Sequence, residues 1–194
     1  MTTAVRPAAE RETLTRAAAE RFAASSAVSQ QFFDANADAI ARACHAMAGR
    51  FQKGGRLFVC GDGAQRSDVA HVVVEFLHPV VVGKRALPAI PLPDMAGGAA
   101  QRGLDTMARS GDLLMVLCAG APEDCARELL AAAQADGLLT LALIGQCGES
   151  SSLAYHVFEV SSFDPCIVQE THEMLYHVLW ELVHVFFEHR AVNA

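Results

Sequence analysis

The chain has 194 residues, of which 52% are apolar and 19% are charged, so it is long enough to bury the core of one ordinary domain and is not disordered as a whole. Its net charge of -7, without a cluster of basic residues along the sequence, argues against nucleic acid as a direct partner and against an anionic membrane surface. No apolar stretch reaches the length of a membrane span, the amino terminus lacks the apolar region of a secretory signal, and the six cysteines form no compact disulfide pattern, so we expect a reduced, cytoplasmic protein without membrane contact.

The first 52 residues predict helices. Residues 8–25 are rich in Ala, Glu and Arg, which have high helix propensity. From Val28 to Phe51 the apolar residues recur mostly every three or four positions, as in an amphipathic helix. We therefore expect an N-terminal helical hairpin, an arrangement that often contributes oligomer contacts.

Residues 53–194 alternate short apolar strands with helices. This pattern predicts a parallel sheet that helices cover on both faces. Prolines interrupt the second strand, which suits a position at the sheet edge. The last helix begins at Asp164 and Pro165 and extends to about His189. No linker or repeat divides residues 1–194, so we expect a single domain. The expected strands are residues 57–60, 86–92, 113–118, 138–144 and 156–160.

Residues 56–77 organise the chain as a strand, a glycine-bearing loop and a helix. Such a strand-loop-helix junction is where α/β proteins hold anions and polar ligands. On the helix, His71 and Glu75 are four residues apart, so both side chains leave the same face. They can converge on one metal ion or one substrate.

The final helix carries polar side chains among its apolar ones. Gln169 and His177 lie eight residues apart on roughly one side, with Glu173 between them. His172 and His177 are five apart, which turns them onto different faces and excludes the metalloprotease motif. His184 lies about 10 Å further along the axis than His177, too far to share an ion with Gln169.

Two interpretations of these polar residues remain open. His71, Glu75, Gln169 and His177 together suit Zn²⁺, and Glu75 could also act as a base. Alternatively, each His is a hydrogen-bonded core or interface residue and each acid is a solvated partner. For a single residue taken alone, the second interpretation is the more common one.

Taken together, these stretches resemble the sugar isomerase (SIS) domain family, most closely its sedoheptulose 7-phosphate isomerase (phosphoheptose isomerase) branch. The resemblance rests on GDGAQRSDVAHVVVEF at the first loop and helix, PAIPLPD near the second strand, GDLLMVLCAGAPED at the second loop and IVQETHEMLYHVLWELV in the final helix. It implies an SIS-type three-layer αβα sandwich with a five-stranded parallel sheet. It also implies a homotetramer with the active site between subunits.

The resemblance assigns roles to particular residues. Zinc would be bound by His71, Glu75, Gln169 and His177. Glu75 and His177 would be the acid/base pair that moves a proton between C1 and C2 of a sugar or sugar phosphate through an enediol. The residues expected to contact the substrate are Gly61, Asp62, Gly63, Gln65, Asp94, Cys118, Ala119, Gly120, Glu123 and Gln169.

The chain departs from the family where phosphate is bound. Gln65 stands where the family has Ser, Asp62 replaces an Asn, and the second loop, residues 118–123, lacks the family's hydroxyl side chains. If Glu123 pointed inward, each like-charge contact with a phosphate at about 4 Å would cost about 4 kcal/mol at an effective dielectric of about 20. Alternatively, Glu123 only complements the dipole of the helix that follows. A family Arg has no match, because Pro79 occupies its position; Arg66, Lys84 or Arg85 could supply a substitute cation.

Three functions follow from these observations. The first is a zinc-dependent aldose-ketose isomerase with altered phosphate recognition. The second is a non-catalytic SIS protein that binds a carbohydrate derivative or a protein, as some SIS-like proteins bind a replication initiator. The third is an isomerase or lyase for an uncharged substrate. Relatives that bind proteins tend to lose the catalytic glutamate, so the presence of Glu75 favours an enzyme.

Overall fold

The computed structural model describes residues 8–61, 63–79, 81–148 and 152–191. Its centre is a sheet of five parallel strands in the order β2-β1-β3-β4-β5, as the sequence predicts. Leu57, the first residue of β1, pairs with Ala89 of β2 and with Leu113 of β3, which sets the register of these three strands. The strands are β1 (Leu57–Gly61), β2 (Ala89–Pro91), β3 (Leu113–Leu117), β4 (Leu139–Ile144) and β5 (His156–Glu159).

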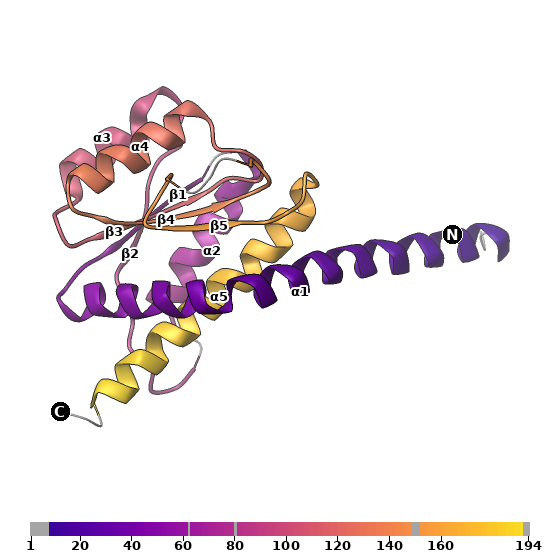
Figure 1. Cartoon of the computed structure of the whole chain (residues 1–194), viewed down its shortest axis with the longest axis horizontal. Helices are drawn as coiled ribbons and strands as arrows, with labels where there is room; N and C mark the ends of the chain where they lie inside the picture. The colour runs from indigo at the N-terminus through magenta and orange to yellow at the C-terminus, as the bar shows by residue number, and fades with distance from the viewer. Residues whose placement is uncertain (1–7, 62, 80, 149–151, 192–194) are drawn as a thin grey trace, which may run out of the picture.

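Helices cover both faces of the sheet, so the protein is a three-layer αβα sandwich (Figure 1). Side chains alternate between the two faces along each strand. In β1, Leu57 and Val59 enter a core with α1, α2 and α5, whereas Phe58 and Cys60 enter a second core with α3 and α4. The helices of the first face are α1 (Ala8–Gln52), α2 (Arg66–Leu77) and α5 (Pro165–Ala191), and those of the second are α3 (Ala99–Met107) and α4 (Asp124–Ala135).

The N-terminal hairpin prediction is wrong, because α1 is one helix of 45 residues. No Gly or Pro occurs between Ala8 and Ala48, so nothing in the sequence ends the helix. Its second half, from about Ser29, packs in the core, while its first half extends past the sheet (Figure 1). In that first half Phe22 is 75% exposed. The two helical patterns in the sequence are therefore two environments of one helix.

The remaining element boundaries follow local chemistry. The Asp164 side chain accepts hydrogen bonds from the backbone N–H groups of Cys166 and Ile167, which starts α5 where the sequence predicts. Strand β2 is only three residues long and lies at the sheet edge, as its prolines suggest. Two short 3₁₀ turns, Gly63–Gln65 and Ala96–Gly98, precede α2 and α3. Within the described residues, none of the helices has the length and apolar character needed to cross a bilayer.

Candidate metal centre

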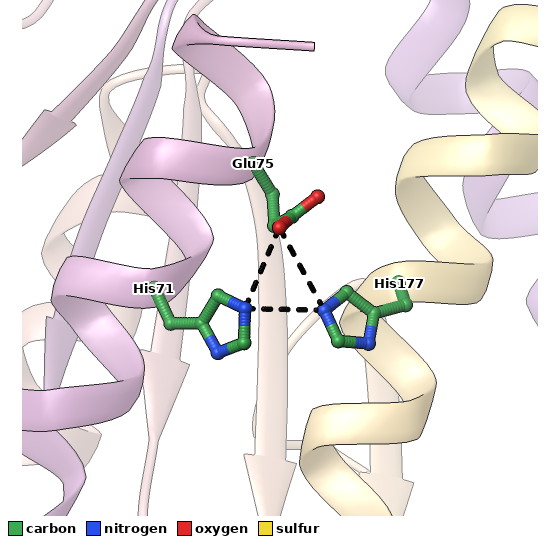
Figure 2. Close-up of side chains that lie close together, drawn as sticks. All are labelled: His71, Glu75 and His177. Carbon is green, nitrogen blue, oxygen red and sulfur yellow. Dashed lines mark hydrogen bonds and ion pairs between the residues drawn. The ribbon is translucent and has the colours of Figure 1, made fainter. Parts of the chain in front are cut away.

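Helices α2 and α5 lie side by side and bring three side chains from distant parts of the chain together. His71 and Glu75 come from α2 and His177 from α5, and all three point toward one another (Figure 2). The Nε2 atoms of His71 and His177 are 3.2 Å apart. Glu75 Oε1 lies 3.5 Å from His71 Nε2 and 4.0 Å from His177 Nε2. We call these residues the α2/α5 trio.

The spacing of the trio suits a tetrahedral metal ion. Zinc is bound by imidazole nitrogen and carboxylate oxygen at about 2.0–2.2 Å, so two ligand atoms of a tetrahedral site lie roughly 3.4 Å apart. The three observed separations, 3.2, 3.5 and 4.0 Å, bracket this value. Two imidazoles and a carboxylate also form the donor set of known zinc sites with three protein ligands. The trio therefore fits a zinc ion in both chemistry and spacing.

Two residues to which the sequence analysis gave no role contact the His71 ring on its Nδ1 side, opposite the trio. The Tyr176 hydroxyl lies 2.9 Å from His71 Nδ1, and Glu173 Oε1 lies 3.5 Å from the same nitrogen. Tyr176 is fully buried, and its pKa is raised by burial and, secondarily, by nearby carboxylates, so its hydroxyl keeps its proton. Contacts to Nδ1 fix the orientation of an imidazole whose Nε2 faces a metal.

Gln169, the expected fourth ligand, lies on α5 two turns before His177. Its amide nitrogen donates to Asp68 Oδ1 at 3.0 Å and to Ser67 Oγ at 3.4 Å. These contacts occupy the nitrogen end of the amide and leave its oxygen as the atom suited to a cation. Burial raises the Asp68 pKa, while the hydrogen bond from Gln169 opposes the rise. Asp68 lies three residues before His71 on α2 and connects this helix to Gln169 on α5. The sequence analysis did not predict this contact.

The first-loop residues lie on another side of α2. Gly61 and Asp94 line a cavity of about 360 Å³ with Arg66, whereas the trio is not part of that lining. Of the three cations that could replace the missing family Arg, Arg66 therefore lies near the first loop, which is predicted to bind the sugar. Lys84 pairs with Glu188, and the Arg85 guanidinium lies over the Phe187 ring.

Gln65 and Gly63, two further residues of the first loop, lie in different environments. Gln65 is 1% exposed, and both polar atoms of its amide lack a hydrogen-bond partner among the described residues. Gly63 is exposed and has the positive φ of 47° that favours glycine. Asp62 lies outside the described residues.

The second loop connects β3 to α4. Cys118 is buried, and Gly120 is exposed. Ala119 packs closely against Gly145, since a Cβ on that glycine would lie 2.6 Å from the Ala119 carbonyl oxygen. Glu123 is exposed at the N-cap of α4 and makes no side-chain capping bond. Its exposure agrees with a solvated acid at a helix start.

A larger cavity of about 870 Å³ opens beside the trio, between α1 and α5. His177 and Glu173 contribute to it from α5, and Phe22, Ser25 and Phe33 from α1. This volume is within the range of small-molecule sites. The trio therefore has space for an organic ligand next to it.

Comparisons with known proteins find phosphoheptose isomerases among the sequence relatives of this chain. No protein-family model matches the chain. It is 34% identical to the phosphoheptose isomerase of Chlorobium phaeobacteroides, over 71% of this chain and 68% of that protein. It is 29% identical to the phosphoheptose isomerase of Thermodesulfovibrio yellowstonii, over 83% of this chain and 87% of that protein.

Solved structures share the fold. A phosphoheptose isomerase from Francisella tularensis matches with a TM-score of 0.76 and 20% identity, covering 88% of this chain and 97% of that chain. HobA from Helicobacter pylori, solved in complex with domains I and II of DnaA, matches with a TM-score of 0.63 and 10% identity, covering 95% of this chain and 98% of that chain.

Proposed function

Because this chain belongs to the sugar isomerase (SIS) domain family, close to phosphoheptose isomerase, we propose that it is a zinc-dependent aldose-ketose isomerase. The observation that carries this proposal is the α2/α5 trio, whose three ligand atoms lie within 4.8 Å of one another. The trio would hold the ion through its two Nε2 atoms and the Glu75 carboxylate, with the Gln169 oxygen as a fourth ligand. Zinc would polarise the carbonyl and hydroxyl oxygens of the sugar.

The side chains of the trio can supply the proton transfers of an aldose-ketose conversion. Glu75 would accept the proton from C2 of an aldose and return it to C1. His177 would move the second proton, from the hydroxyl on C2 to the oxygen on C1, by way of an enediol. Both groups come from rigid helices, and the Glu75 carboxylate is 16% exposed, which limits competition from water.

The substrate of this proposed isomerase is a sugar that is not held by phosphate in the way the family holds it. The second loop offers no hydroxyl side chain, and Glu123 stands at the start of α4. Arg66 is the cation nearest to the loop that would bind the sugar, since it lines the same cavity as Gly61 and Asp94. A weakly charged or uncharged sugar does not depend on the hydroxyl donors that the second loop lacks.

A non-catalytic binding protein is the second candidate, because HobA, which was solved in complex with domains I and II of DnaA, shares this fold over nearly the whole chain. That likeness concerns the fold alone. A protein with only a binding role would have no need for the trio, which is complete here. A homotetramer, a single-domain organisation and a cytoplasmic location stay predictions; the exposed Phe22 on α1 supports contacts between copies.

Proton exchange in deuterated water tests the enzyme proposal. The zinc-loaded protein is incubated with sedoheptulose and, separately, with sedoheptulose 7-phosphate, and exchange at the carbons next to the carbonyl is followed by NMR. We expect exchange that the Glu75→Gln variant abolishes and the Glu181→Gln variant retains, because Glu181 is an exposed acid of α5 that does not belong to the trio.

Calorimetry on the same samples tests the predicted phosphate recognition. We expect weak binding of sedoheptulose 7-phosphate, and micromolar affinity would contradict the interpretation of the second loop. Lack of exchange with any sugar, with Glu75→Gln and parent identical in ligand binding, would instead support the non-catalytic candidate.

A further inference from the structure

We propose a second ligand site in this protein, a cationic cavity for small molecules that carry two or more phosphate charges. The cavity has a volume of about 660 Å³ and lies at the amino ends of β1 and β3. In Figure 1 this is the region where α1 ends and the chain turns into β1. The predicted sugar-binding loops follow the carboxyl ends of the same two strands, and no residue of the trio lines this cavity, so the site is separate from both. Its cations are Arg50, Lys53, Arg56 and Arg109.

A buried carboxylate builds the floor of this cavity. Asp112 is 4% exposed and accepts hydrogen bonds from the backbone N–H groups of Arg56 at 2.8 Å and of Arg109 at 2.9 Å. The Arg56 guanidinium donates to Asp112 Oδ2 and to the Met107 carbonyl, each at 2.7 Å. These bonds tie the two loops together and fix the Arg56 side chain. Because Nε and Nη2 of Arg56 are taken up by these contacts, an anion would meet only the Nη1 end of an already ordered guanidinium.

The remaining cations are available for a ligand. Arg50 is anchored through one nitrogen, Nη1, which donates to the Gly137 carbonyl at 3.1 Å. The Lys53 and Arg109 side chains are exposed and have no polar partner within the described part of the chain. Four cations and one carboxylate give the cavity a charge of +3, although the whole chain carries -7. The positive potential is therefore local.

The helix dipole explains only part of this cluster. Cations near the end of α1 complement its negative end, which would account for Arg50 and Lys53 without a ligand. Arg109 belongs to a different loop, and the dipole gives no reason for its side chain to line the same cavity. Convergence of cations from two segments on one cavity is what a polyanion requires.

Glycines keep the cavity open and bring its two loops together. Gly54 and Gly111 have φ angles of 86° and 99°, which other residues rarely adopt. A Cβ on Gly55 would lie 2.7 Å from the Gly111 carbonyl oxygen, so the loops approach too closely for a side chain there. A Cβ on Gly54 would meet nothing within 4 Å, which leaves space for a ligand. The cavity volume suits a small phosphorylated molecule.

Calorimetric titration of the full chain with inorganic pyrophosphate tests this site. We expect the Lys53→Ala/Arg109→Ala double variant to bind pyrophosphate roughly tenfold more weakly than the parent, because it removes the two cations without protein partners. The matched control is Arg11→Ala/Arg16→Ala, which removes the same charge from the exposed first half of α1 and should change the affinity less than about twofold. Orthophosphate should bind more weakly than pyrophosphate, since it cannot reach the anchored and the free cations together.

Two further variants separate this site from the others on the protein. His177→Ala should keep pyrophosphate binding, which shows that the anion is not held by metal in the trio. Arg66→Ala should also keep it, which excludes the predicted sugar loop. The proposal is overturned if pyrophosphate does not bind at millimolar concentration, if both double variants lose the same affinity, or if only Arg66→Ala or His177→Ala weakens binding.

Discussion

His172 gives the fold a sensitivity to acid whose size follows from its burial. Its side chain on α5 is fully buried, and burial lowers its pKa from 6.5 to about 4. In the unfolded chain the imidazole takes up a proton as the pH falls through about 6.5, whereas in the fold it stays neutral until about pH 4. Between these values the unfolded state binds more protons, so the free energy of unfolding falls as the pH falls.

The magnitude of this loss is about 3 kcal/mol over the whole window, because a shift of one pKa unit corresponds to about 1.4 kcal/mol. Between pH 7 and pH 5 the loss is about 2 kcal/mol, which is roughly 4–8 °C in the melting temperature of a chain of this size. Urea unfolding of the parent and of His172→Leu at both pH values measures it. Carboxylates titrate in both proteins, so the difference between them isolates His172.

We expect the Leu variant to lose about 2 kcal/mol less than the parent on acidification from pH 7 to pH 5. Leucine is close to histidine in size and leaves no buried polar atom, so the variant should fold. Equal losses in the two proteins would refute the reasoning that the buried neutral imidazole resists protonation in the fold.

Two further predictions concern residues that position others. Tyr176→Phe removes the hydroxyl that orients His71, so it should weaken zinc binding about 10- to 100-fold. A competition titration with a chromophoric chelator measures the affinity. An unchanged affinity would show that the contact does not position the ring. Asp112→Ala should lower the free energy of unfolding by about 1–3 kcal/mol in urea, because two backbone N–H groups lose their acceptor and the Arg56 guanidinium keeps only the Met107 carbonyl; an unchanged free energy of unfolding would contradict this role.

The sheet and its helices follow from the sequence because their signals are local. Short continuous apolar runs such as residues 113–118 are typical of strands buried on both faces, and β3 is such a strand. Asp164 marks the start of α5 through hydrogen bonds within one turn. The hairpin prediction failed because a change of amphipathic pattern after residue 25 was interpreted as a turn, although no Gly or Pro occurs there.

The candidate site is only partly visible in the sequence. His71 and Glu75 share a helix face through spacing, but their meeting with His177 depends on how α2 packs against α5, which no local signal specifies. The same packing places Tyr176 and Asp68 in the site, and neither has a spacing that distinguishes it from an ordinary helical residue. The spacing of His172 does not reveal that its side chain is fully buried, because burial depends on how α5 packs in the fold.

Zinc stoichiometry combined with X-ray absorption tests the central claim most directly. The account predicts about one zinc per chain, with imidazole nitrogens at about 2.0–2.1 Å, and loss of this ion in His71→Ala and His177→Ala but not in His78→Gln, which changes an exposed histidine outside the trio. A protein that binds no zinc, or that keeps the same zinc spectrum after His177→Ala, would contradict it.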